Sequence, residues 1–378
     1  MQSKYCAWER KKLLKSKDIF MSNEVENKVP GLLVRRTIEQ LQTYPKWSKK
    51  DYIKYYIKKI LGKNPPKRNT FFWPHAMLAM GLAEYHWISM DQSALNILQE
   101  YYSGWKKKGC PLHNVDDTMN GCALVYLNEN IGGWDEEINK IRDMILAYPL
   151  DKNGNLLYRK HCSDYVFVDT IGMVVPFLTE YYRIHPEDTK ALELAEKQIL
   201  NFLQNGMDED TGLPYHGFDS QTGNKCGIIG WGRALGWLLL GMAYYVKNAE
   251  NPNLEIVEQL KGILLKVCNY QREDGSFAWQ ITAREGHEDT SATAMICYAM
   301  KIGLDKPEFN ESEREKLEKS ICNGAKSLHK NTKDGNVVNC SGECQGFGMY
   351  PQIYGTYPWA QGMALALLAS SEQMYWRE

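Results

Sequence analysis

Asp169 is an acidic residue within a largely apolar stretch, residues 165–182, and its surroundings suggest chemistry. Apolar residues recur there at alternating spacings of three and four, which is typical of one face of a helix: Val168, Ile171, Val175, Leu178 and Tyr182. A carboxylate in such surroundings is costly unless it is paired, caps a helix or has a function. An Asp just before a helix is commonly an N-cap, so capping is the alternative to a catalytic role.

A second acidic position opens another apolar stretch, at Asp116 and Asp117. If Asp116 and Asp169 face one cavity, the pKa of one carboxylate rises and a proton donor near neutral pH results. A helix N-terminus acts in the opposite direction, because it favours the charged form. Adjacent residues of a helix point about 100° apart, so either Asp116 or Asp117 could face the cavity.

Arg233 lies between two tryptophans, Trp231 and Trp237, at the start of a further apolar stretch. An arginine stacked on a tryptophan is a common structural contact. The functional alternative is a clamp for a carboxylate, because the guanidinium group matches a carboxylate with two parallel hydrogen bonds.

Two histidines are further candidates for contact with a ligand. His216 lies between Tyr215 and Asp219 in a long loop, where it could be solvated, contact a substrate or carry a proton. His161 belongs to a short basic run, residues 159–161, just before Asp169. Such a run is usually a solvated face, and contact with an anionic substrate is its functional alternative.

The rest of the chain predicts helices in pairs, in which an amphipathic segment alternates with a more apolar one rich in small residues. The amphipathic segments lie near residues 31–44, 92–107, 133–148, 187–205, 254–270 and 311–330. The apolar segments lie near residues 72–86, 116–128, 165–182, 229–247, 287–303 and 357–375. A helix with a charged face belongs outside and one that is apolar all round belongs inside. These pairs predict an all-α (α/α)6 barrel of alternating outer and inner helices, with an open solenoid as the alternative.

A barrel of this kind would bring the candidate residues together. Parallel inner helices begin at the same end, so their first residues converge in one funnel. Acidic, aromatic, His and Arg residues gather at these starts, whereas the later turns are Ala, Leu, Met and Val. Long loops feed the same end, at residues 149–164, 206–228 and 331–356, and loops of this length are usually functional.

Composition limits the partners and the compartment. The net charge of the 378 residues is −1, so no basic field for nucleic acid exists. No signal-peptide core and no apolar run of membrane-spanning length is present, and the ten cysteines suit thiols in a reducing cytosol. Cys340 and Cys344 lack a second ligand pair, so we expect no metal. We expect a cytoplasmic monomer or homodimer without a cofactor, a nucleic-acid partner or a membrane partner.

The domain organisation is expected to be simple. Residues 1–30 are polar and Lys-rich and read as a lead-in to a single catalytic domain over residues 31–378. No nucleophile elbow, P-loop or dinucleotide-binding glycine motif is evident, which argues against acyl transfer and nucleotide chemistry.

Six motifs resemble the unsaturated uronyl hydrolases of glycoside hydrolase families 88 and 105, above all the unsaturated rhamnogalacturonyl hydrolases of family 105. They share the order and spacing of the family from about Trp73 to the C-terminus: WPHAMLAMGL (73–82), VDDTMNG (115–121), VDTIGMVVPFL (168–178), YHGFD (215–219), WGRALGW (231–237) and EDTSATAM (288–295). The resemblance implies an (α/α)6 barrel, in agreement with the helix pattern.

The resemblance also implies roles for the candidate residues. Asp169 would be the general acid/base, which protonates C4 of the 4,5-double bond of an unsaturated uronic acid and then activates the water that adds at C5. The product is an unstable hemiketal that opens and releases the aglycone. Asp116 would hold the sugar ring and assist the proton donor. His216, Arg233 and Trp237 would line the subsite, and Trp73 would stack on the sugar. His161 is a further candidate for contact with the substrate, from its place in the basic run.

The expected function is therefore the breakdown of lyase-generated pectic disaccharides, small anionic substrates in which an unsaturated galacturonyl residue is joined to rhamnose. Departures from the family pattern at Asp117, Phe167 and Leu235 bear on the substrate subtype more than on the chemistry. The alternatives are another (α/α)6 enzyme, either an inverting glycosidase with a separate base or a sugar epimerase, and a non-enzymatic helical binding protein.

Overall fold

The computed structural model describes residues 31–43, 49–62, 71–159 and 164–375. Within these residues, six helices form the inner ring: α4 (Trp73–Ser89), α6 (Asn120–Ile131), α8 (Asp169–Ile184), α10 (Gly232–Asn248), α12 (Thr290–Gly303) and α14 (Pro358–Tyr375). Outer helices alternate with them: α2 (Gly31–Gln42), α5 (Gln92–Lys106), α7 (Asp135–Leu146), α9 (Thr189–Asn205), α11 (Leu254–Val267) and α13 (Glu311–Lys330). An inner helix such as α10 is buried all round, whereas an outer helix such as α11 is buried along one stripe.

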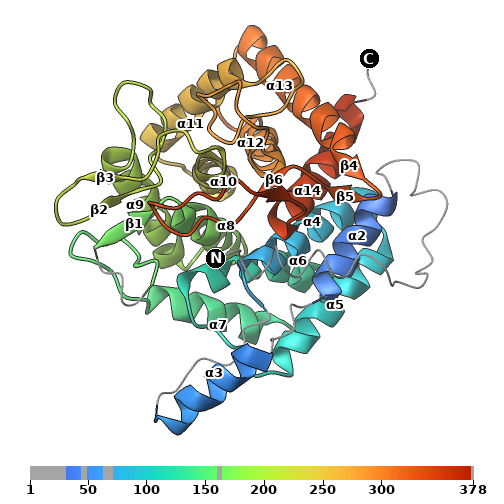
Figure 1. Cartoon of the computed structure of the whole chain (residues 1–378), viewed down its shortest axis with the longest axis vertical. Coiled ribbons are helices and arrows are strands. Elements are labelled where there is room, and N and C mark those ends of the chain that lie inside the picture. The colour runs from blue at the N-terminus through green and yellow to red at the C-terminus, as the bar shows by residue number, and fades with distance from the viewer. Residues whose placement is uncertain (1–30, 44–48, 63–70, 160–163, 376–378) are drawn as a thin grey trace.

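The inner helices close into a ring. Each packs against the next one along the chain, and α14 packs against α4, which joins the last inner helix to the first. Each outer helix contacts the two inner helices beside it, so the outer ring covers the grooves of the inner one (Figure 1). The (α/α)6 barrel is confirmed. The open solenoid is wrong, because the end helices of a solenoid do not pack on each other.

A pair of glycines allows α14 to close the ring against α4. A Cβ atom on Gly81 would lie 2.2 Å from the carbonyl oxygen of Gly362, and a Cβ atom on Gly362 would lie 2.1 Å from the carbonyl oxygen of Met77. Since no side chain fits at either position, glycine is required for this close approach of the two backbones. The small residues of the apolar segments therefore mark where the inner helices touch.

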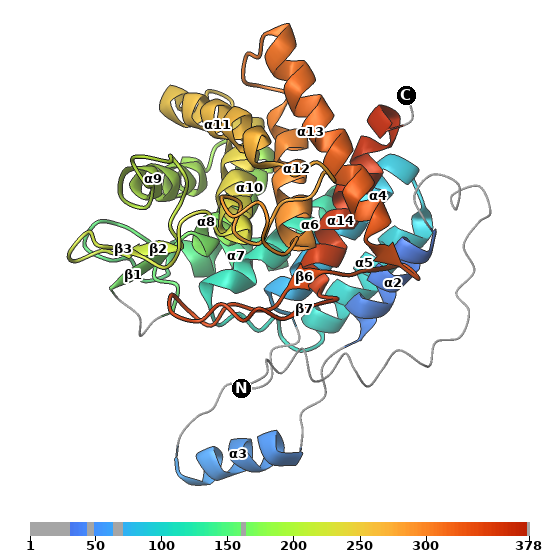
Figure 2. The same cartoon turned by 45° about the horizontal axis from the view of Figure 1, so that its top comes forward.

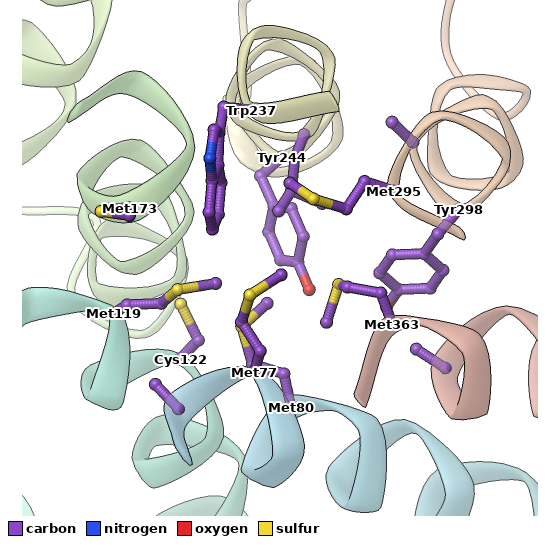
Figure 3. Packing of buried hydrophobic residues seen from close by; sticks show 14 of the residues in the cluster. Met77, Met80, Met119, Cys122, Met173, Trp237, Tyr244, Met295, Tyr298 and Met363 are labelled. Atoms are coloured by element: carbon purple, nitrogen blue, oxygen red, sulfur yellow. The ribbon is translucent and has the colours of Figure 1, made fainter. Parts of the chain in front are cut away.

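The middle of the barrel is filled by side chains. Figure 3 shows sulfur-containing and aromatic residues of the inner helices packed together, among them Met77, Met295, Met363 and Tyr244. These side chains are almost completely buried. Methionine fills irregular gaps well because its side chain is flexible and polarizable. With the middle closed in this way, a ligand has to bind at one end of the barrel.

Short strands form in the loops beside the barrel. An antiparallel sheet contains β1 (Tyr165–Phe167), β2 (Gly217–Asp219) and β3 (Lys225–Cys226). Two further pairs join β4 (Thr332–Lys333) to β5 (Asn336–Val337) and β6 (Cys340–Ser341) to β7 (Tyr354–Gly355). The segment between β6 and β7 extends along the same side of the barrel as β1 and β2 (Figure 2). Phe347 of this segment stacks on Phe167 of β1, with ring centroids 4.2 Å apart.

Some expected boundaries are wrong. The helix expected over residues 165–182 begins at Asp169, because residues 165–167 pair with β2 instead. The strands were not expected, since elements of two or three residues are too short for apolar alternation to show. A further helix that the pattern does not predict, α3 (Lys49–Ile60), lies outside the ring (Figure 1).

The lead-in expected over residues 1–30 lies outside the described residues. Among the residues that are described, the structure contains no helix that is both long enough and apolar enough to cross a bilayer.

Candidate active site

The sheet brings Asp169 and His216 together. In its antiparallel register Phe167 faces Gly217, and the adjacent Val168 N–H donates to the His216 carbonyl at 3.0 Å. Asp169 follows as the first residue of α8, and Nε2 of His216 lies 3.0 Å from its Oδ2 atom. His216 is 2% exposed, whereas 13% of the Asp169 side chain is accessible. The His216 side chain is thus held inside the protein, whereas the Asp169 carboxylate reaches the protein surface.

Asp169 is not a helix cap. Val168 occupies the N-cap position of α8, and within the described residues the hydrogen-bond partner of the Asp169 carboxylate is the imidazole of His216. An N-cap carboxylate would instead accept a backbone N–H of the first turn. The contact with His216 therefore rules out the N-cap role that the sequence left open for Asp169.

Rings pack closely around the imidazole of His216, with centroids 4.7 to 5.3 Å from its own: Phe167, Trp231 and Phe347. On the side away from Asp169, Nδ1 lies 2.8 Å from the Tyr350 hydroxyl and 3.9 Å from Sγ of Cys344. The imidazole therefore has one orientation, held at both nitrogens.

Asp116 lies in the 3-10 turn η1 (Val115–Met119), before α6, and pairs with Arg159. The guanidinium group donates to both carboxylate oxygens at 3.1 Å. Burial raises the pKa of Asp116, the Arg159 charge lowers it, and the nearby charge of Asp169 raises it further. The two acids of the sequence pattern therefore belong to one electrostatic site.

Asp117 has a different role. Its Oδ2 atom accepts the backbone N–H groups of His113 and Asn114, at 2.7 and 3.1 Å, and so closes its own turn. Of the two neighbouring acids, Asp116 is the one that meets Arg159 and Asp169.

Arg233 is held inside the wall of the barrel and is 3% exposed. Its guanidinium lies 4.7 and 5.5 Å from the centroids of two indole rings, those of Trp231 and Trp359. Nη1 donates to the hydroxyls of Ser341 and Ser291, at 2.7 and 3.2 Å, and Nη2 donates to the Gly342 carbonyl at 2.9 Å. The structure thus shows the stacking contact with Trp231, while the carboxylate clamp stays a prediction.

The same two serines connect Arg233 to a buried acid, Asp289. Ser291 and Ser341 each donate a hydroxyl to the Asp289 carboxylate at 2.7 Å and accept from Arg233. Asp289 is the N-cap of α12 and is fully buried. Because a buried charge is costly without partners, Arg233 balances Asp289 through these hydroxyls.

Trp73, at the start of α4, lies among the other indole rings. Its centroid is 5.8 Å from that of Trp237 and 5.0 Å from that of Trp359. Trp73 is 9% exposed and Trp237 is 1% exposed. Trp73 is the more accessible of the two rings and so the better candidate to stack on a sugar, while the contact of Trp237 with substrate stays a prediction.

Glu343 belongs to none of the sequence motifs. It lies in the segment between β6 and β7. Its side chain is exposed, yet burial by the surrounding protein raises its pKa, and the charges of Arg233, Asp116 and Arg159 act on it. Glu343 therefore belongs to the same group of charges as Asp116, Arg159 and Arg233. The length of the 331–356 loop is the signal that could have found it.

Arg159, the first residue of the basic run before Asp169, is not simply solvated, because it pairs with Asp116. His161 of the same run lies outside the described residues. Cys340 is buried and Cys344 lies beside His216. In the part of the chain that the structure describes, no three His, Cys, Asp or Glu side chains are arranged to hold a metal.

Acids, indole rings and a histidine thus gather at one end of a closed (α/α)6 barrel, on the starts of the inner helices and on the segments that lead into them. A sequence model described as Glycosyl Hydrolase Family 88 matches residues 47–375, and the chain belongs to this family. The resemblance to the unsaturated uronyl hydrolases of families 88 and 105 is thereby confirmed, and the chain is a glycoside hydrolase.

Solved structures share the fold over nearly the whole chain. A possible member of glycoside hydrolase family 105 from Klebsiella pneumoniae is 18% identical, with a TM-score of 0.79 and 98% of each chain covered. A possible family 105 member from Salmonella enterica is 18% identical, with a TM-score of 0.77, over 97% of this chain and 99% of the other. An unsaturated glucuronyl hydrolase from Bacillus sp. GL1 is 15% identical, with a TM-score of 0.70, over 94% of this chain and 98% of the other. None of the curated proteins matches the chain.

Proposed function

We propose that this enzyme releases an unsaturated uronic acid by hydrating its C4=C5 double bond, with Asp169 as general acid/base. Asp169 transfers its proton to C4, and positive charge develops at C5 and the ring oxygen. A water molecule then adds at C5 and returns a proton to Asp169. The hemiketal opens and the aglycone leaves. The contact between Asp169 and His216 carries the proposal, because it positions one accessible carboxyl group to give and then take a proton.

The proposed substrate is an unsaturated galacturonyl residue joined to rhamnose. Its support is the order of the family 105 motifs along the chain. Galacturonic and glucuronic acids differ only at C4, which is planar in the unsaturated sugar. The enzyme must therefore distinguish its substrates by the linkage and the aglycone rather than by the unsaturated ring.

This substrate assignment is tested by offering unsaturated galacturonyl-rhamnose and unsaturated glucuronyl disaccharides separately. The ultraviolet absorbance of the double bond follows turnover. A higher kcat/KM for the rhamnose disaccharide supports the pectic assignment. A preference for the glucuronyl disaccharides would overturn it and leave the reaction itself standing.

The uronate carboxylate needs a cation at this site. We infer that Arg159 meets it, because 33% of its side chain is accessible while its guanidinium stays fixed on Asp116 and over the Tyr158 ring, 4.1 Å away.

An inverting glycosidase is the second candidate, and it requires a base separate from the acid. Asp116 would have to be that base, but Arg159 already holds both of its oxygens. This contact favours a mechanism in which Asp169 acts alone.

Asp116→Asn distinguishes these mechanisms. We expect kcat/KM to fall by roughly 10²-fold, because Arg159 loses the partner that orients it, while slow turnover persists. The measurement compares kcat and KM of Asp116→Asn and Asp169→Asn on one substrate. Equal and complete loss of turnover in both variants would instead support the inverting glycosidase.

Glu343→Gln tests the third acid. An ionised Glu343 repels an anionic substrate, so the variant should lower KM at neutral pH by about fivefold. Because the pKa of Glu343 is raised, the wild-type carboxyl is neutral at low pH and becomes charged as the pH rises. The wild-type KM should therefore rise with pH, and that rise should disappear in Glu343→Gln.

The control for this change is Glu258→Gln, which alters an exposed acid on the outer helix α11. It should leave KM and its pH dependence unchanged. An unchanged KM in Glu343→Gln across the same pH range would show that Glu343 does not face the substrate.

The compartment proposed for this enzyme is the cytosol. All eight cysteines within the described residues are free thiols, which suits a reducing environment. The monomer or homodimer expected from the sequence stays a prediction.

A further inference from the structure

Tyr350 contacts the imidazole of His216 on the side away from Asp169. Its hydroxyl is 2.8 Å from Nδ1, and Nε2 of the same ring is 3.0 Å from Oδ2 of Asp169. Tyr350, His216 and Asp169 thus form a hydrogen-bonded series that ends at the proposed acid/base. Tyr350 takes no part in the proton transfers proposed at C4 and C5.

The surroundings of Tyr350 allow its phenol to donate to Nδ1 of His216. The Tyr350 oxygen accepts the backbone N–H of Ile228, so its own hydrogen is available for Nδ1 of His216. Burial raises the pKa of the Tyr350 phenol, which therefore keeps that hydrogen. A neutral imidazole that accepts at Nδ1 carries its hydrogen on Nε2 and donates from there.

The other neighbour of Nδ1 does not compete for this position. The thiol of Cys344 lies 3.9 Å from Nδ1, and at 3.1 Å it donates to the carbonyl of Gly346. Burial raises the pKa of this thiol to about 12, so its hydrogen stays on sulfur at neutral pH. Of the two neighbours of Nδ1, Tyr350 is therefore the one placed to donate to it.

The backbone beside Tyr350 is shaped for this contact. Gly227 has φ +83°, and a Cβ atom there would lie 2.5 Å from the Tyr350 hydroxyl and 2.6 Å from Cβ of His216. Only glycine lets the chain turn so close to both side chains and present the Ile228 N–H to the phenol.

We propose that Tyr350 is a positioning residue that holds His216 in the tautomer donating from Nε2 to Oδ2 of Asp169. This inference rests on the proposed role of Asp169 as acid/base. Because Oδ2 already accepts a hydrogen, the proton of the acid form resides on Oδ1. The same donor stabilises the carboxylate once that proton has moved to C4.

The tautomer can be read without turnover, by nitrogen NMR of the labelled protein, with His216 assigned through His216→Gln. In the wild type we expect a pyridine-like Nδ1 and a pyrrole-like Nε2. In Tyr350→Phe we expect the two nitrogen signals to move toward each other, as both tautomers become populated. We also expect kcat to fall by about tenfold or more while KM changes by less than about twofold.

Tyr354→Phe is the matched control, since it removes a phenol hydroxyl from the same part of the chain. That hydroxyl donates to Gln352 at 2.8 Å and not to His216. The control should keep the wild-type nitrogen signals and kcat.

A hydrogen on Nδ1 in the wild type would overturn the inference, and so would wild-type signals with wild-type kcat in Tyr350→Phe. The expected wild-type tautomer without turnover of any unsaturated uronide would support the tautomer assignment. That result would overturn the proposed function instead, so the two failures are distinguishable.

Discussion

Replacement of Asp169 by Asn is expected to lower kcat by about 10³-fold or more without unfolding the protein. The amide has nearly the shape of the carboxyl group and still contacts His216, but it neither gives nor takes the proton that the double bond requires. Asp169 does not cap α8, so the helix should keep its stability. The measurement pairs kcat, from the absorbance of the double bond, with the melting temperature.

Asp135→Asn is the control for this variant. Asp135 also opens a helix, α7, but it lies exposed on the outer ring and accepts from Asn128 at 2.8 Å. Its replacement should change neither kcat nor the melting temperature. Wild-type kcat in Asp169→Asn would contradict the proposed acid/base, and loss of activity together with a large fall in melting temperature would indicate a structural role.

Replacement of Arg233 by Met should have the largest effect on stability. The apolar side chain fits between the indole rings of Trp231 and Trp359 but leaves the hydroxyls of Ser291 and Ser341 without their donor. Asp289 then remains buried without a balancing charge. We expect the free energy of unfolding to fall by about 3–5 kcal/mol, as measured by denaturant unfolding.

Arg314→Met removes a more exposed arginine, with 45% of its side chain accessible, and should cost much less. If Arg233→Met instead kept the wild-type stability and only raised KM for the anionic substrate, Arg233 would be the carboxylate clamp that its place in the sequence suggests.

The architecture could be predicted because helix periodicity and polarity are local properties of the sequence. The alternation of amphipathic and apolar segments distinguished outer from inner helices, and it also placed Asp169 and Asp116 at the starts of inner elements. The predicted helix boundaries were wrong where pairing with a distant segment determines the backbone conformation. Residues 165–167 look helical by spacing, yet they pair with Gly217–Asp219 as a strand.

The site could be predicted only in part, since its contacts depend on where distant loops meet. His216 lies 47 residues from Asp169, and the register of a very short sheet brings them together. Arg159 looked like part of a solvated run because its partner Asp116 is 43 residues away. Glu343 and Tyr350 belong to a loop whose length indicated function but whose sequence does not show which side chains turn inward.

The most direct test of the central claim follows two signals in one reaction of the wild-type enzyme with unsaturated galacturonyl-rhamnose: the absorbance of the double bond and the amount of free rhamnose. Hydration of the double bond precedes release of the aglycone, so the absorbance should fall from the first time point, at least as fast as rhamnose appears. Rhamnose that appears while the absorbance persists would show displacement at the anomeric carbon and would contradict hydration by Asp169.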